Sequence, residues 1–245
     1  MRARASHRVA AGLLACAGAL AAALGASPAV AQVPPSATEA AAYRGLHAAA
    51  WRGDVAAIEK AVAQARERGA VKATLEARDA NGRTPLHVAT FARQRGAVKA
   101  LLVAGADHVA FENGRYDAVT IAAVADDEET LALLLAGGAS AKLTTSRYDG
   151  TALIAAAHLG HDGVVRQLIQ AGAPLDHVNN LHWTAVIEAI VLGDGGPRHQ
   201  ATLKALLDAG ASTKLADRSG ATPLALARQR GYTAMVRMLE AAGAR

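Results

Sequence analysis

The chain has little of several things that large globular enzymes use. It contains one cysteine, Cys16, so an internal disulfide and a multi-cysteine zinc site are both excluded. Aromatic residues make up 3% of the 245 positions, although 52% of the residues are hydrophobic. A large single core normally uses more aromatic side chains. A chain rich in alanine and leucine is better suited to thin, closely packed pairs of helices.

A strong excess of one charge is also missing. The formal net charge is +5, from 26 basic and 21 acidic residues. Residues 1–31 contain three of the basic residues, Arg2, Arg4 and Arg8, and no acidic residue. The remaining chain therefore has a net charge near +2. This balance gives little reason to expect nucleic acid or an anionic membrane surface as the partner.

No catalytic motif is present in the sequence. There is no nucleophile elbow, phosphate loop, zinc-protease motif or paired-carboxylate motif, and Gly193-Asp-Gly-Gly is too short for a phosphate loop. His158 and His161 have a spacing that suits a metal on a helix, but no compact four-ligand pattern surrounds them. We therefore predict no enzyme, no cofactor and no metal site.

The first 31 residues have the layout of a secretory signal peptide. A basic start to Arg8 precedes an apolar run from Val9 to Ala26, and Ala29-Val-Ala31 provides a cleavage site before Gln32. Two alternatives remain: a retained membrane anchor, and a lipoprotein attached through Cys16 after Leu13-Leu-Ala. We expect cleavage after Ala31, export to the periplasm and no stable membrane insertion afterwards. Residues 32–40 are expected to be an extended linker.

A repeat accounts for the rest of the chain. A Thr or its substitute recurs at intervals of 33, 34, 33 and 38 residues, at Thr84, Asp117, Thr151, Thr184 and Thr222. The second unit opens with Thr84-Pro-Leu-His87, and the units close with Gly-Ala. This pattern resembles the ankyrin repeat family. The resemblance implies an all-α solenoid of about six helix-turn-helix units with β-turn fingers.

The resemblance covers residues 41–245, and the expected units are 41–78, 79–111, 112–145, 146–178, 179–216 and 217–245. Thr84 is expected to cap a helix that has Pro85 at its first position. In the degenerate third unit Asp117 takes the place of the capping Thr. Gly105 and Gly172 are expected to end helices in the left-handed conformation.

The family resemblance also implies where a partner binds: the finger tips and the inner helix faces. The residues that match these positions best are Arg83, Phe91, Tyr116, Arg147, Tyr148, His158, His182 and Trp183. Tyr116, Tyr148 and Trp183 would follow one another in three successive fingers, where aromatic side chains act as binding hot spots. The alternative is that these rings only pack one finger against the next. The resemblance gives His87 and His161 structural roles.

The fifth unit has five extra residues between its helices, around Gly193-Asp-Gly-Gly-Pro197. In the same unit Glu188 stands where Val88 and Leu226 stand in others, so a carboxylate is expected in an apolar interface and needs a partner. One interpretation is that loop N–H groups or Arg198 bind Glu188 and fix the insertion. The other is a ligand or partner site at Glu188, Asp194, Arg198 and His199.

These observations favour a monomeric, non-catalytic module of the bacterial envelope that binds another protein. Two alternatives are a small-ligand or metal-binding accessory protein that uses loop 193–199, and a secreted effector directed at a host.

Overall fold

The computed structural model describes residues 32–245, of which residues 34–245 form one compact unit. Its elements are α2 (Ala37–Ala42), α3 (Gly45–Arg52), α4 (Val55–Glu67), α5 (Val71–Leu75), α6 (Pro85–Phe91), α7 (Arg95–Ala104), α8 (Ala118–Val124), α9 (Glu128–Ala136), β1 (Thr144–Thr145), β2 (Gly150–Thr151), α10 (Ala152–Leu159), α11 (Asp162–Gln170), α12 (Ala185–Val191), α13 (Pro197–Asp208), α14 (Pro223–Gln229) and α15 (Thr233–Ala241).

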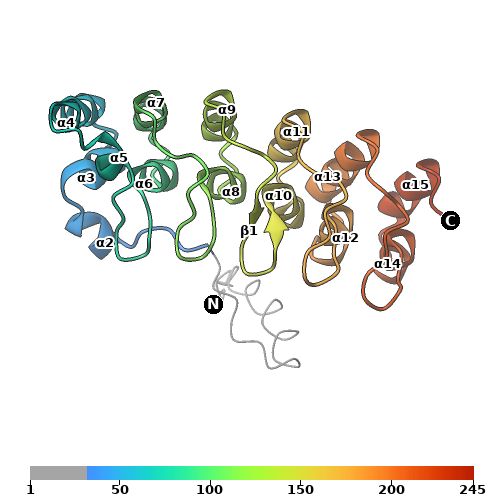
Figure 1. Cartoon of the computed structure of the whole chain (residues 1–245). Helices are drawn as coiled ribbons and strands as arrows, with labels where there is room; N and C mark the ends of the chain where they lie inside the picture. Colours follow the sequence, from blue (N-terminus) through green and yellow to red (C-terminus); the bar gives the residue numbers. More distant parts are fainter. Residues whose placement is uncertain (1–31) are drawn as a thin grey trace, which may run out of the picture. The chain divides into compact units, whose positions relative to one another are not determined.

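Six helix pairs lie within this unit, and they form two layers (Figure 1). The inner helices are α3, α6, α8, α10, α12 and α14, and the outer helices are α4, α7, α9, α11, α13 and α15. Each helix packs against its partner in the pair and against the corresponding helices of neighbouring pairs. One continuous apolar cluster, mostly Ala, Leu, Ile and Val, fills the space between the layers. The predicted all-α solenoid of helix-turn-helix units is confirmed.

The inner helices begin as the repeat pattern predicts. In five of them a Thr or Asp precedes the helix and accepts a hydrogen bond from the backbone N–H three residues later; the caps are Thr84, Asp117, Thr151, Thr184 and Thr222. These bonds satisfy N–H groups that have no partner inside the helix. The third unit therefore keeps its helix start despite its different sequence.

The outer helices α7 and α11 end just before Gly105 and Gly172, as predicted. Gly105 has φ +94° and Gly172 has φ +78°, both in the left-handed region that disfavours other residues. The next residue then donates back across the turn, as from the Ala173 N–H to the Leu168 carbonyl (2.9 Å). This geometry closes the helix and directs the chain toward the next unit.

The fingers are the turns before the inner helices, at residues 79–83, 112–116, 146–150, 179–183 and 217–221, and they are numbered by their units as the second to the sixth finger. Backbone bonds join successive fingers, from Asn113 N–H to Asn81 O (3.0 Å), from Ser146 N–H to Arg115 O (2.9 Å), and from Asn180 N–H to Tyr148 O (2.9 Å). In the fourth unit β1 and β2 pair antiparallel across the finger. The fingers are thus held in a row at fixed spacing.

The start of the repeat array differs from the expected linker at 32–40. The chain is without regular structure to Ser36, but α2 begins at Ala37. Ser36 and Glu39 form a reciprocal cap, in which each side chain accepts from the backbone N–H of the other (3.2 and 2.7 Å). The Pro-Pro pair at 34–35 favours an extended chain only as far as Ser36, and the Ser36–Glu39 cap then starts a helix that continues to Ala42.

The expected signal peptide, 1–31, lies outside the described residues. Within residues 32–245 no helix is both long enough and apolar enough to cross a membrane.

Candidate functional site

The finger row presents side chains from three successive units at its surface. Arg147 and His182 are exposed at the tips of the fourth and fifth fingers, and Tyr116, Tyr148 and Trp183 are half-buried. The inter-finger backbone bonds set these residues side by side. Trp183 also packs against the apolar core, so packing between fingers explains part of its burial. The aromatic rings therefore combine a structural contact with an accessible face.

A second row lies on the last turns of the inner helices. Phe91, Val124, His158 and Val191 occupy equivalent positions in α6, α8, α10 and α12, at intervals of 33, 34 and 33 residues. His158 is exposed, and the three apolar side chains are half-buried. The inner helices thus offer a largely apolar strip with one polar ring.

Arg83 is a correction to the predicted surface. Its side chain is 4% exposed because it lies beneath α2, where its guanidinium is 3.3 Å from Glu39 and 3.6 Å from Asp79. It also stacks over the Phe91 ring, 5.4 Å from the ring centre. The missed helix α2 is the reason, because its Glu39 contacts Asn81 and Arg83 in the finger at 79–83. Arg83 therefore belongs to the internal contacts of the fold.

Glu188 is buried, at 5% exposure, as the repeat register predicts. Its predicted partners are wrong. Its Oε1 accepts from the Asn179 side-chain amide (3.0 Å), and its Oε2 lies 3.5 Å from His158 Nδ1. Neither the inserted loop nor Arg198 contacts the carboxylate in these bonds. Glu188 instead joins its own finger to the inner helix α12 and reaches across to α10.

The sequence contains a signal for this pairing that the repeat analysis missed. Asp79 and Asp217 occupy the finger position of Asn179 in the second and sixth units, and each accepts N–H bonds from its own turn. Asn179 keeps that role, since its Oδ1 accepts from the Leu181 and Trp183 N–H groups. Its amide NH₂ is then left to donate to Glu188. Asn179 and the buried Glu188 occur in the same unit and therefore form a matched hydrogen-bonding pair.

Burial sets the charge state of both groups that meet at this contact. Burial away from solvent raises the pKa of Glu188 to about 7. The hydrogen bond from Asn179 lowers this pKa, but its effect is smaller. The His158 side chain is still 46% exposed, but its partial desolvation beside Glu188 lowers its pKa, helped by the nearby His199 and His161. Although the two side chains lie at ion-pair distance, the uncharged forms of both are favoured. The Glu188 carboxyl is therefore mainly neutral below about pH 7 and mainly ionised above it.

The inserted loop, residues 192–196, is held by other residues. The two ring nitrogens of His199 lie at hydrogen-bond distance from Asp194 Oδ1 (2.8 Å) and from the His158 carbonyl oxygen (2.9 Å). The Tyr232 hydroxyl donates to the Gly193 carbonyl (2.9 Å), and the Gln200 amide donates to the Gly195 carbonyl (2.7 Å). The loop is therefore tied to both the fourth and the sixth units.

Arg198 points away from the loop toward earlier units. Its guanidinium donates to Asp126 Oδ2 (2.8 Å) and lies 3.6 Å from Asp162. These contacts connect the fifth unit to the third and the fourth. Glu188, Asp194, Arg198 and His199 consequently do not converge on one point, and the polar groups of the loop bind one another.

The histidines at repeat positions have structural partners. His87 accepts from the Thr84 N–H (3.1 Å) and donates to the Ala110 carbonyl (3.1 Å), and its burial lowers its pKa to about 4. His161 donates to the Ala123 carbonyl (2.9 Å). No group of three or more His, Cys, Asp or Glu side chains within residues 32–245 is arranged to hold a metal ion.

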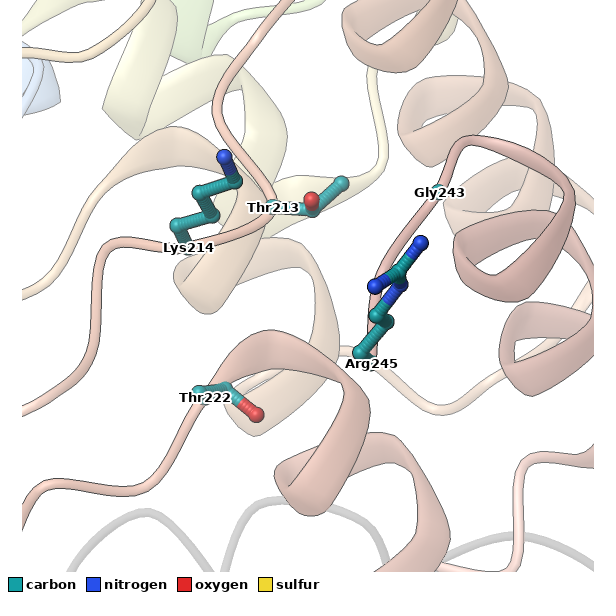
Figure 2. A pocket seen from close by; sticks show the side chains of 5 residues that line it. All are labelled: Thr213, Lys214, Thr222, Gly243 and Arg245. Atoms are coloured by element: carbon teal, nitrogen blue, oxygen red, sulfur yellow. The ribbon is translucent and has the colours of Figure 1, made fainter.

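Two hollows lie away from the finger row. One, of about 500 Å³, is an apolar groove between α4 and α7 that includes Val55, Val62 and Val103. The other, of about 440 Å³, is near the C-terminal end, lined by Thr213, Lys214, Thr222, Gly243 and Arg245. Figure 2 shows that the Lys214 amine and the Thr222 hydroxyl do not point toward each other. Because these polar groups do not converge, this hollow is a poor candidate for an anion site.

Comparisons with known proteins agree with the repeat pattern. A family model described as ankyrin repeats in three copies matches residues 119–217, and a single ankyrin repeat model matches residues 81–113. The ankyrin repeat protein YahD of Escherichia coli (strain K12) is 34% identical over 167 residues, which are 68% of this chain and 83% of that protein.

Solved structures are similar over most of the chain. An ankyrin repeat domain from Acinetobacter baumannii AYE is 43% identical with a TM-score of 0.75, over 82% of this chain and 98% of that one. The ankyrin repeat domain of Bcl-3 is 27% identical with a TM-score of 0.74, over 83% of this chain and 88% of that one.

Proposed function

This chain belongs to the ankyrin repeat family, whose repeats are generally protein–protein interaction modules, and we propose that it binds one partner protein along its fingers and inner helices, without catalysis, in the bacterial envelope. The continuity of this face carries the proposal. Three successive fingers place aromatic side chains in one row, beside the strip of Phe91, Val124, His158 and Val191.

Tyr148 is the best-placed anchor in this face. It lies in the fourth finger, flanked on both sides by fingers that also carry an aromatic side chain, and its hydroxyl has no partner among residues 32–245. Half-buried aromatic rings with a free polar end are frequent hot spots in protein interfaces. Tyr148 can therefore provide both apolar contact area and a hydrogen bond to a partner protein.

The Tyr148→Ala variant tests the proposed binding face. We expect it to weaken partner capture by 30-fold or more, equivalent to about 2 kcal/mol, while the folded state is little affected. The measurement is capture from the envelope fraction, with affinity titrated once the partner is identified and melting followed in parallel. Lys99→Ala on the exposed side of α7 is the control. Equal loss of stability and binding would assign Tyr148 to packing alone.

The envelope location rests on the signal-peptide pattern at 1–31. We expect the exported protein to begin at Gln32, and the mass of its N-terminal peptide measures this directly. A lipid-modified Cys16 at the N-terminus would instead favour the anchored alternative. Cell fractionation into periplasm, membrane and medium separates a periplasmic module from a secreted effector.

The small-ligand alternative on loop 193–199 has less support. Its carboxylate, its imidazole and two of its carbonyls already bind one another or neighbouring units. A ligand would have to displace these internal bonds.

A further inference from the structure

We propose that the partner segment seated on the fingers is acidic, and that Arg147, with Tyr116 and Tyr148 beside it, binds one of its carboxylates. The inference rests on the proposed function and adds the chemistry of the partner.

Arg147 differs from the other finger arginines in having a side chain without a partner among residues 32–245. Arg83 is buried against Glu39 and Asp79. Arg115 pairs with Asp149 (3.1 Å), and Arg218 donates to the Asn180 carbonyl (2.9 Å). Arg147 is exposed at the tip of the fourth finger, where its own carbonyl accepts from the Asn180 side chain (2.9 Å). Its backbone is fixed while its guanidinium donors stay available.

The acidic side chains of the same fingers are already engaged. Glu112 accepts from the Tyr116 N–H (3.1 Å), and Asp149 is bound to Arg115. Asp217 accepts three bonds from Ser219 and Ala221, which lower its pKa. These carboxylates stabilise turns or pair with Arg115, and none of them forms an ion pair with Arg147. The Arg147 guanidinium is therefore left available to an incoming chain.

Two tyrosines lie in the finger row with Arg147, Tyr148 next to it in the chain and Tyr116 in the preceding finger. The pKa of Tyr116 is raised, chiefly by burial, and both Tyr148 and Arg147 lie close enough to influence it. The Tyr116 phenol therefore keeps its proton at neutral pH. Neither the Tyr116 nor the Tyr148 hydroxyl has a partner within the described part of the chain. A guanidinium fork and two phenolic O–H donors match a carboxylate, which accepts several hydrogen bonds and is bound in two-point fashion by arginine.

The neighbouring fifth finger suits a polypeptide that continues past this anchor. His182 is exposed and Trp183 half-buried beside the exposed Leu181. These side chains offer apolar contact next to the charged position. An extended acidic segment with apolar residues fits this pattern, whereas a uniformly basic segment would meet Arg147 with like charge.

Fluorescence anisotropy with labelled oligoglutamate tests the inference on the protein purified from the cells that make it. We expect measurable binding that weakens with added salt, with oligoglutamine of the same length as the uncharged reference. Arg147→Gln should weaken oligoglutamate binding by ten-fold or more, and Tyr148→Phe by several-fold. Arg237→Gln removes the same charge from an exposed position on α15 and should leave binding nearly unchanged.

Three results would overturn the inference. Oligoglutamate fails to bind, or Arg147→Gln and Arg237→Gln weaken binding equally, or single-stranded DNA of matched charge binds more tightly through the same residues. If oligoglutamate fails while Tyr148→Ala still abolishes capture of the cellular partner, the binding face stands and the acidic partner is rejected. If these substitutions change neither the binding of oligoglutamate nor the capture of the cellular partner, both the acidic partner and the proposed binding function are rejected.

Discussion

Glu188 is a residue at which burial and hydrogen bonding act in opposite directions. The fold removes its carboxyl group from water, which favours the protonated form, while the Asn179 amide favours the charged form. Burial prevails, so the folded protein binds this proton more tightly than the unfolded chain. The stabilising contribution of the proton is therefore complete below about pH 4.5 and is lost as the pH rises through about 7.

The Glu188→Gln variant should remove this loss. Its amide oxygen still accepts from Asn179, but no buried charge develops at high pH. We expect the variant to be more stable than the parent by about 2–3 kcal/mol near pH 8 and nearly equal to it near pH 4.5. Urea unfolding at both pH values measures the difference. His158 acts in the opposite sense, since its lowered pKa costs stability as the pH falls below about 6.5, and both proteins share this cost.

The matched control is Glu59→Gln, an exposed carboxyl on α4. It should show no comparable dependence on pH. A gain for Glu188→Gln that is the same near pH 4.5 and pH 8 would mean that the carboxyl is neutral throughout, and that packing alone explains the effect.

At the scale of elements, local rules predicted the inner-helix starts and the two outer-helix ends. The caps at Thr84 and Asp117 and the left-handed glycines at 105 and 172 are fixed by neighbours in sequence, so the pattern suffices. The contacts of the inserted loop were not predictable in this way. Tyr232 lies 39 positions from Gly193 in the loop, and Asp126 lies 72 positions from Arg198, which follows the loop.

The same limit explains the incorrect expectation for Arg83. Its repeat position indicated a surface residue, as in other fingers. What buries it is α2, an element before the first repeat that the repeat period does not describe. The repeat register therefore predicts which residues lie on the fingers and inner helices, whereas the exposure of each side chain depends on contacts between units.

At the scale of the whole repeat unit, stability comes from contacts between neighbours. Each helix pair packs against the neighbouring pairs, and the apolar cluster runs through all six pairs. An interior pair has two interfaces, whereas α14 and α15 have neighbours on one side, α12 and α13. This arrangement explains why a periodic sequence predicts the fold well and the partner poorly: the period encodes the interfaces, and the variable finger tips encode recognition.

Two matched leucine-to-alanine substitutions should show that the effect on stability depends on the position of the helix pair in the array. Leu134 in α9 and Leu239 in α15 are both fully buried, and replacing either with Ala should cost about 2–5 kcal/mol locally. We expect Leu239→Ala to speed amide hydrogen exchange in residues 217–245 while the first units keep their protection. Leu134→Ala should weaken both interfaces of a central pair and lower the urea midpoint of the whole array. If Leu239→Ala instead accelerates exchange equally from α3 to α15, the array unfolds as one cooperative body, and the single-sided interface of the last pair does not control its stability.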